Sequence, residues 1–266
     1  MKRIPIVILS LFLIAELNAQ ELYVFSEPAS NMPAHTLTLK TSALFGKERH
    51  HFEGNSRRFI PELMLGINKK LMIHAGTTLS NMFSEETRWE SVYLYGKYRF
   101  LSFDEVHKHF RMAAFAEAAY SRNEPYFDEL SLQGERTGLQ AGIIATQLVH
   151  KFAASFTGSF IQAEKNNKDL PARAINYSLS AGVLLLPREY TSYKQLNVNL
   201  YAELLGQQTL DKSSRYLDLA PSIQLIFNSN SKLNLGYRYQ LDGNQLRGME
   251  KYFLVSFEHT FFNVLK

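Results

Sequence analysis

The sequence predicts an all-β protein whose strands close into an up-and-down antiparallel barrel that crosses a membrane, with about 12 strands. Three observations predict this fold class. Apolar and polar residues alternate with a period of two, the connections between the alternating segments are long and short in turn, and aromatic residues gather near the segment ends.

The composition excludes several other classes of protein. A hydrophobic content of 45% with a formal charge of only +4 excludes a disordered tail. The absence of cysteine excludes a disulfide framework, a thiolate metal site and a cysteine nucleophile. Beyond residue 20, no apolar run approaches the roughly 18 residues that a spanning helix needs.

Residues 1–19 have the pattern of a cleaved secretory signal peptide. Three basic-region residues precede the apolar stretch 4–15, and Ala19 offers a cleavage point. Removing Lys2, Arg3 and Glu16 changes the charge from +4 to 4 − 2 + 1 = +3, and no basic stripe points to nucleic acid. We therefore expect export, no nucleic-acid partner, and residues 20–35 as a periplasmic leader before a barrel of residues 36–262.

Strict alternation is clearest in the segments 152–160, 175–185, 196–204 and 233–239. In the second of these, Ile, Tyr, Leu, Ala, Val and Leu occupy the odd positions, while Asn, Ser and Gly occupy the even positions up to 182. Successive side chains of a strand point to opposite faces, so each segment has one apolar and one polar face.

Weaker copies of this pattern extend the series to an even number of strands, as single-chain outer-membrane barrels require. Pro221 and the alanine-rich run 112–119 fit less well, because proline removes a ladder donor and alanine favours helix. Ten or fourteen strands also fit. The expected strands are 36–45, 59–68, 71–81, 90–100, 110–120, 138–149, 152–162, 174–185, 195–205, 216–227, 232–241 and 251–262.

The connections predict the topology independently. The odd-numbered ones, such as 46–58 and 122–136, are long and charged, whereas most even-numbered ones, such as 69–70 and 150–151, are short. The stretches 101–109 and 187–194 are intermediate. Membrane barrels have short periplasmic turns and longer outer loops, so both termini, including the tail 263–266, are expected on the periplasmic side.

Aromatic residues agree with this topology. Rings are expected in two girdles where the barrel meets the lipid headgroups. Under the predicted topology, Phe100, Phe110, Phe152, Phe227 and Phe261 fall near the periplasmic ends of their strands, and Phe45, Phe59, Trp89, Tyr120 and Phe160 near the outer ends.

The last segment, 251–262, is alternating, aromatic and almost C-terminal, and it resembles the terminal strand that outer-membrane proteins offer to the barrel-assembly machinery. Together with the patterns above, the chain resembles a Gram-negative outer-membrane β-barrel of the small porin-like or transporter type. The leader 21–34 also resembles that of a group of such barrels, which lends no catalytic or binding residues. The resemblance implies an outer-membrane location, with membrane lipid, lipopolysaccharide and the assembly machinery as partners.

A secreted soluble β-sandwich or barrel would alternate too, but its polar face would meet bulk solvent. Here the polar face carries mostly Ser, Thr, Asn, Gly and Tyr, while charge is concentrated in the connections. A confined lumen explains that distribution better than a solvent-exposed surface.

The expected lumen carries a set of charged side chains that either select solutes or pair and fill the interior. A barrel of about 12 strands lies between the filled and the open sizes, so both readings stay open. The favoured function is a passive channel or transporter for small solutes, without a cofactor. The expected lumen-lining charges are Lys40, Glu62, Lys97, Arg99, Arg111, Glu117, Glu203, Arg238 and Glu258.

Two alternative functions remain. An outer-membrane lipid hydrolase is one, although the sequence holds no G-x-S-x-G motif and we assign no catalytic residue. A structural or adhesive barrel is the other. His50 and His51, close to two glutamates in the first long connection, are weak candidates for a metal site, and no H-x-x-x-H spacing supports them.

Overall fold

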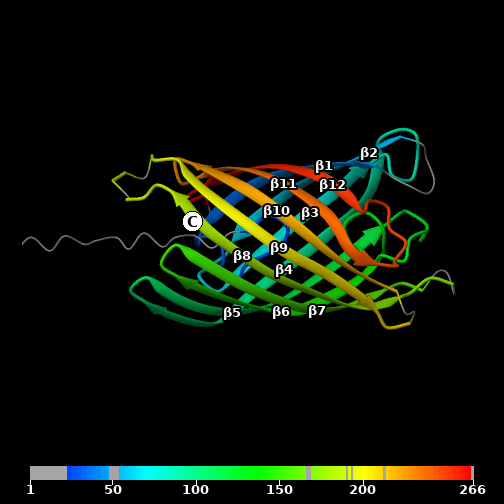
Figure 1. The fold of residues 1–266 in the computed structure, drawn as a ribbon, viewed down its shortest axis with the longest axis horizontal. Helices are drawn as coiled ribbons and strands as arrows, with labels where there is room; N and C mark the ends of the chain where they lie inside the picture. Colours follow the sequence, from blue (N-terminus) through cyan, green and yellow to red (C-terminus); the bar gives the residue numbers. More distant parts are fainter. Residues whose placement is uncertain are drawn as a thin grey trace, which may run out of the picture.

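The computed structural model describes residues 23–47, 54–165, 169–189, 191–192, 194–211 and 214–264. These residues form a closed barrel of antiparallel strands (Figure 1). None of their segments is a helix long and apolar enough to cross a membrane. The strands are β1 Thr36–Lys47, β2 Asn55–Gly66, β3 Leu71–Ser80, β4 Arg88–Glu105, β5 Lys108–Ser121, β6 Gly138–Val149, β7 Phe152–Ala163, β8 Arg173–Leu186, β9 Asn197–Thr209, β10 Arg215–Phe227, β11 Ser231–Gly243 and β12 Lys251–Phe261.

Each strand pairs with its neighbours in sequence, and β12 closes the barrel by pairing with β1. That last register runs from Leu37 opposite Phe261 to Gly46 opposite Tyr252. The predicted fold class and the strand count of 12 are therefore confirmed.

The two faces of the strands have opposite character. In β8, Leu179 is 54% exposed on the outer surface, whereas its neighbour Ser180 is 0% exposed in the interior. The same holds around the barrel, where large apolar side chains are exposed and many polar ones are buried. An apolar exterior around a polar interior is the arrangement of a barrel that spans a lipid bilayer, and it excludes the soluble alternative.

The segments that fitted the pattern less well are regular strands. The run 112–119 lies within β5, paired along its length with β4 and β6. Pro221 lies on the outer face of β10, opposite Ala202 of β9. On its other side, β10 and β11 pair at Leu219–Tyr239 and again at Ser222–Gly236, and Pro221 lies in the gap between these two pairs. The missing proline N–H therefore falls where β11 makes no close pairing.

The strands are longer than expected at several ends. β4 and β5 continue to a two-residue turn at 106–107, so the stretch 101–109 is not an intermediate loop. The connection 187–196, predicted as an intermediate stretch 187–194, is as long as several odd-numbered connections and is an exception to the alternation. The other even-numbered connections are short and lie at the end where the C-terminus lies, and the odd-numbered ones lie at the opposite end (Figure 1).

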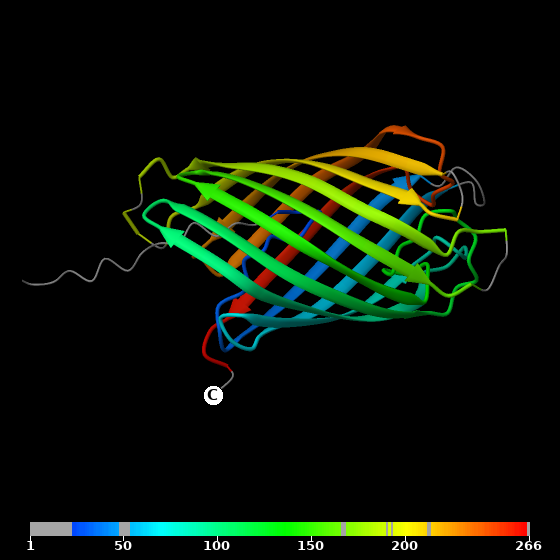
Figure 2. The same cartoon turned by 90° about the horizontal axis from the view of Figure 1, so that it is seen from below.

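The described part of the leader lies inside the barrel. We expected residues 20–35 as a segment in the periplasm, but residues 23–28 and 30–33 line the interior cavity beside β1, β2 and β12. The dark-blue trace can be followed within the barrel in Figure 2. Buried charged groups on the inner wall bind this segment, as described below. We call residues 23–35 the N-terminal segment.

Candidate functional site

The expected lumen charges lie on the inward positions of their strands. Lys40, Glu62, Glu117, Arg238 and Glu258 line the central cavity. Lys97, Arg111 and Glu203 are buried, and Arg99 is half-buried two positions after Lys97. Their role in solute passage stays a prediction.

Lys97 holds the N-terminal segment at the β4 side of the barrel. Its ammonium Nζ donates to Pro28 O at 2.6 Å and Ser30 O at 2.9 Å, and it pairs with Glu27 Oε2 at 3.1 Å. Burial raises the pKa of Glu27, but the opposing field of Lys97, with smaller contributions from other cations, lowers it to about 2 overall. The ion pair is therefore intact throughout the ordinary pH range.

Glu203 of β9 holds the beginning of the same segment. Its carboxylate accepts the backbone N–H groups of Val24 at 3.0 Å, Phe25 at 2.9 Å and Ser26 at 2.9 Å. The Ser26 hydroxyl donates a further bond at 2.6 Å. A buried carboxylate is costly unless it is hydrogen-bonded, so the segment supplies the donors that Glu203 needs.

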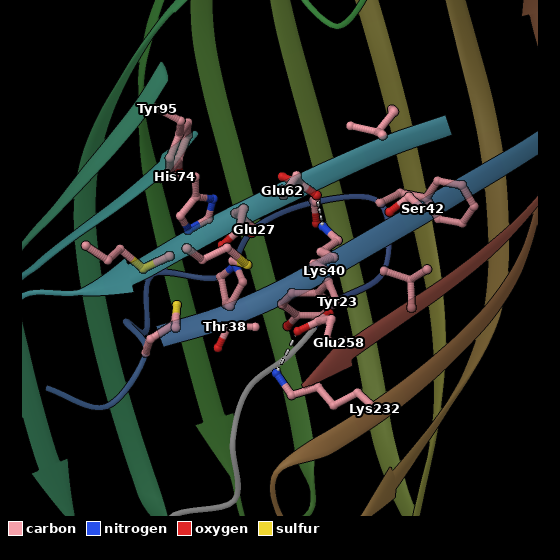
Figure 3. A pocket seen from close by; sticks show the side chains of 18 of the residues that line it. Tyr23, Glu27, Thr38, Lys40, Ser42, Glu62, His74, Tyr95, Lys232 and Glu258 are labelled. Atoms are coloured by element: carbon pink, nitrogen blue, oxygen red, sulfur yellow. Dashed lines mark hydrogen bonds and ion pairs between the residues drawn. The ribbon is translucent and has the colours of Figure 1, made fainter. Parts of the chain in front are cut away.

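Between the N-terminal segment and the strands lies a cavity of about 260 Å³. Figure 3 shows Glu27 of the segment facing side chains from β1, β2, β3 and β12. Two ion pairs lie on the cavity wall: Lys40 Nζ to Glu62 Oε2 at 3.0 Å, and Lys232 Nζ to Glu258 Oε2 at 3.1 Å. The cavity is thus polar and largely charge-paired.

At the end of the long connections, loop 122–137 and loop 244–250 fold into the barrel. Arg247 connects them, because its guanidinium donates to Glu129 at 3.1 Å and to Asp218 of β10 at 2.8 Å. The same guanidinium lies 3.8 Å from the ring centroid of Tyr216. Asp218 also accepts from Arg238 at 2.5 Å, so one buried network joins both loops to the wall.

A second buried cluster holds loop 122–137 to β2 and β4. Arg58 lies 3.3 Å from Glu135 and 3.7 Å from Glu90. Burial raises the pKa of Glu135 to about 7, with Arg58 opposing the rise and Glu129 and Glu90 adding to it. One guanidinium therefore serves two buried carboxyl groups, and the cluster retains a proton more readily than free glutamate does.

Within the part of the chain that the structure describes, no group of three or more His, Asp or Glu side chains is placed to hold a metal ion. The two candidates from the sequence, His50 and His51, lie outside the described residues.

Sequence reasoning missed several interior groups. Arg58 was assigned to a loop, whereas Asp218 and Lys232 lie on inward strand positions that the period-two pattern could have identified. Glu27, Glu129 and Arg247 belong to connecting segments, where no periodicity shows that a side chain enters the lumen.

No protein-family model and no curated protein sequence matches the chain. Among solved structures, an outer membrane channel from Pseudomonas putida F1 is similar, with a TM-score of 0.57 and 12% identity over 90% of this chain and 100% of that one. The KdgM porin gives a TM-score of 0.48 and 9% identity, over 84% of this chain and 99% of that one. At these identities the likeness concerns the fold. The chain has the closed-barrel fold of porin-like outer-membrane proteins.

Proposed function

We propose that the chain is an outer-membrane channel through which small polar solutes pass passively, without a cofactor. The observation that supports this function is the apolar exterior around a charged and hydroxylated interior that contains a cavity of about 260 Å³. The exterior needs lipid, and the interior offers polar groups that replace part of a solute's hydration. The similarity in fold to the Pseudomonas putida outer membrane channel supports the same location.

The contents of the lumen make the proposed passage a controlled one. The N-terminal segment lies in the lumen, and loops 122–137 and 244–250 are held to each other and to β10 by Arg247. We expect solutes to pass when the N-terminal segment or the loops move. The segment is the better candidate, because it is joined to the wall by hydrogen bonds and ion pairs and to the barrel only at residue 36.

The proposed location carries the partners that the sequence led us to expect. Residues 1–19 serve as the export signal, the assembly machinery inserts the barrel, and lipid and lipopolysaccharide surround it. These assignments are part of the proposal, but they do not depend on whether solutes pass through the barrel.

The test is conductance in planar bilayers. The mature chain, residues 20–266, is compared with a variant that lacks residues 23–34 and with the matched control Glu164→Gln, an exposed change between β7 and β8. We expect discrete steps for the mature chain and the control, and larger steps for the deletion variant. Silent membranes with all three folded proteins would contradict the channel, and hydrolysis of phospholipid or lipid A by the mature chain would favour the enzymatic alternative.

A further inference from the structure

We infer that the central cavity is a binding site for the ammonium group of a small polar amine, with the Glu117 carboxylate as its counter-ion. This inference rests on the proposed function, because it names the class of solute that the lumen accepts. It is carried by the placement of Glu117, by the pairing of the other charges, and by two buried polar groups that lack partners.

Glu117 lies in a row of inward side chains that crosses the wall of the barrel. His74 of β3 is opposite Tyr95 of β4, and Tyr95 is opposite Glu117 of β5. Adjacent strands are about 4.8 Å apart, so the three side chains form one continuous patch. All three line the cavity.

The other charged groups of this wall already have partners. Glu27 pairs with Lys97, Glu62 with Lys40, and Glu258 with Lys232. Arg238 pairs with Asp218. Among the described residues, Glu117 has neither an ion-pair nor a hydrogen-bond partner, although it faces the cavity. In its ionised form, Glu117 therefore lacks a positive counter-charge.

Two buried polar atoms beside Glu117 also lack partners. The Tyr95 hydroxyl and His74 Nε2 make no hydrogen bond among the described residues, and the two side chains are only 7% and 4% exposed. Buried polar groups are nearly always hydrogen-bonded, so these atoms point to a ligand. A carboxylate and a hydroxyl oxygen accept hydrogen bonds, and so does Nε2 of a neutral histidine whose proton is on Nδ1. With His74 in that tautomer, the patch offers three acceptors to the three N–H donors of an ammonium group.

Ring contacts fix the position of the two polar groups. The Tyr95 ring lies between Phe115, with centroids 5.4 Å apart, and the His74 ring, with centroids 5.0 Å apart. The Tyr95 hydroxyl and the His74 imidazole are therefore held in place beside Glu117. An anionic solute would find the Lys and Arg groups already paired, and a neutral polyol would leave Glu117 uncompensated, so the observations favour an amine.

The test is isothermal titration calorimetry of the folded mature barrel in detergent, with ethanolamine as the probe and ethylene glycol as its uncharged analogue. We expect heat of binding with ethanolamine and none with ethylene glycol. Glu117→Gln should weaken binding about tenfold or more, because the amide can still accept a hydrogen bond but no longer carries the negative charge that pairs with the ammonium group. Tyr95→Phe, which keeps the ring and removes only the hydroxyl, should weaken binding about two- to tenfold through loss of one hydrogen bond.

Glu164→Gln is the matched control and should bind ethanolamine as the unmodified chain does; circular dichroism checks that each variant is folded. Equal binding of ethylene glycol, unchanged affinity in Glu117→Gln, or no binding by the unmodified chain would each overturn the site. Ethanolamine binding without conductance would refute the channel but support the amine site. Conductance without ethanolamine binding would support the channel but refute the amine site.

Discussion

Glu203 is a buried carboxylate that is fully hydrogen-bonded by a segment distant in sequence. Val24, whose N–H it accepts, is separated from it by 179 positions. Three consecutive backbone donors and one hydroxyl converge on two oxygen atoms. Lys97 repeats the arrangement with reversed polarity, since its ammonium donates to two carbonyl oxygens and one carboxylate. The beginning of the segment is thus held by Glu203, and its middle by Lys97 together with Arg111 and Thr146.

Replacing Glu203 should release the beginning of the segment. In Glu203→Ala, the amide hydrogens of Val24, Phe25 and Ser26 lose their acceptor, and each charge-assisted bond contributes about 1.5–3 kcal/mol. Hydrogen–deuterium exchange by mass spectrometry should therefore show at least about tenfold faster exchange of this stretch. Glu164→Ala is the control. Unchanged exchange in Glu203→Ala would show that other contacts hold the segment.

Glu135 predicts a pH dependence of stability. Its pKa is about 7 in the folded barrel against 4.5 for the ordinary group, so the folded state binds the proton more tightly. The associated stability is complete below pH 4.5 and is lost as the pH rises through 7. By this linkage the loss is at most about 3 kcal/mol.

Glu135→Gln should flatten that dependence, because glutamine does not titrate and still accepts a bond from Arg58. Denaturant unfolding in vesicles at pH 5 and pH 8 provides the measurement, with Glu164→Gln as the control. If both variants and the unmodified chain lose the same stability between these values, Glu135 is not the responsible group.

The strand β8 shows how one element meets two environments. Its odd positions, such as Leu179, are exposed on the outer surface, and its even positions, such as Ser178 and Ser180, are buried. Shifting the strand by one residue would turn serine to lipid and leucine to the polar interior. The alternation therefore specifies both the face and the register of the strand.

A charge in the middle of that outer face should be costly. Leu179→Arg places a guanidinium near the bilayer midplane, where it costs about 2–4 kcal/mol. The control Leu210→Arg, just beyond the end of β9, should cost about 0–1 kcal/mol. Unfolding by guanidinium in lipid vesicles measures both, and equal costs would contradict the membrane placement of β8.

Most elements could be predicted because their pattern is local. The run 112–119 has a high helix propensity, but it is flanked by two strands whose free backbone edges it pairs with. Tertiary pairing overrides propensity there. Pro221 fits poorly into the predicted strand, because proline has no backbone N–H to donate. In the structure β10 and β11 are not closely paired at Pro221, so no ladder hydrogen bond is lost there.

At the scale of the whole molecule, the odd-numbered connections lie at one end of the barrel, and the C-terminus lies at the other end with the even-numbered ones. In outer-membrane barrels the long loops face outward and the short turns face the periplasm. The rings follow the same axis: Trp89 and Tyr120 lie close at one end with centroids 6.3 Å apart, and Phe152 and Phe227 are exposed at the other.

Because the chain has no cysteine, single introduced thiols can test this orientation. Asn55→Cys, at the start of β2, should react with an impermeant thiol reagent on intact cells, whereas Asn230→Cys, in the β10–β11 turn, should react only after lysis. Labelling followed by mass spectrometry gives the answer. The opposite result would invert the topology.

The sequence by itself determined the all-β barrel, its even strand number, the polar lumen face and many of the charged residues on it. These follow from a period of two, which is visible within a single strand-length segment. Only the tertiary structure decided that the N-terminal segment lies inside the lumen, that two loops fold inward, and which charges pair. Those features depend on contacts such as Ser26 with Glu203 and Glu129 with Arg247, between residues more than a hundred positions apart in segments without periodicity.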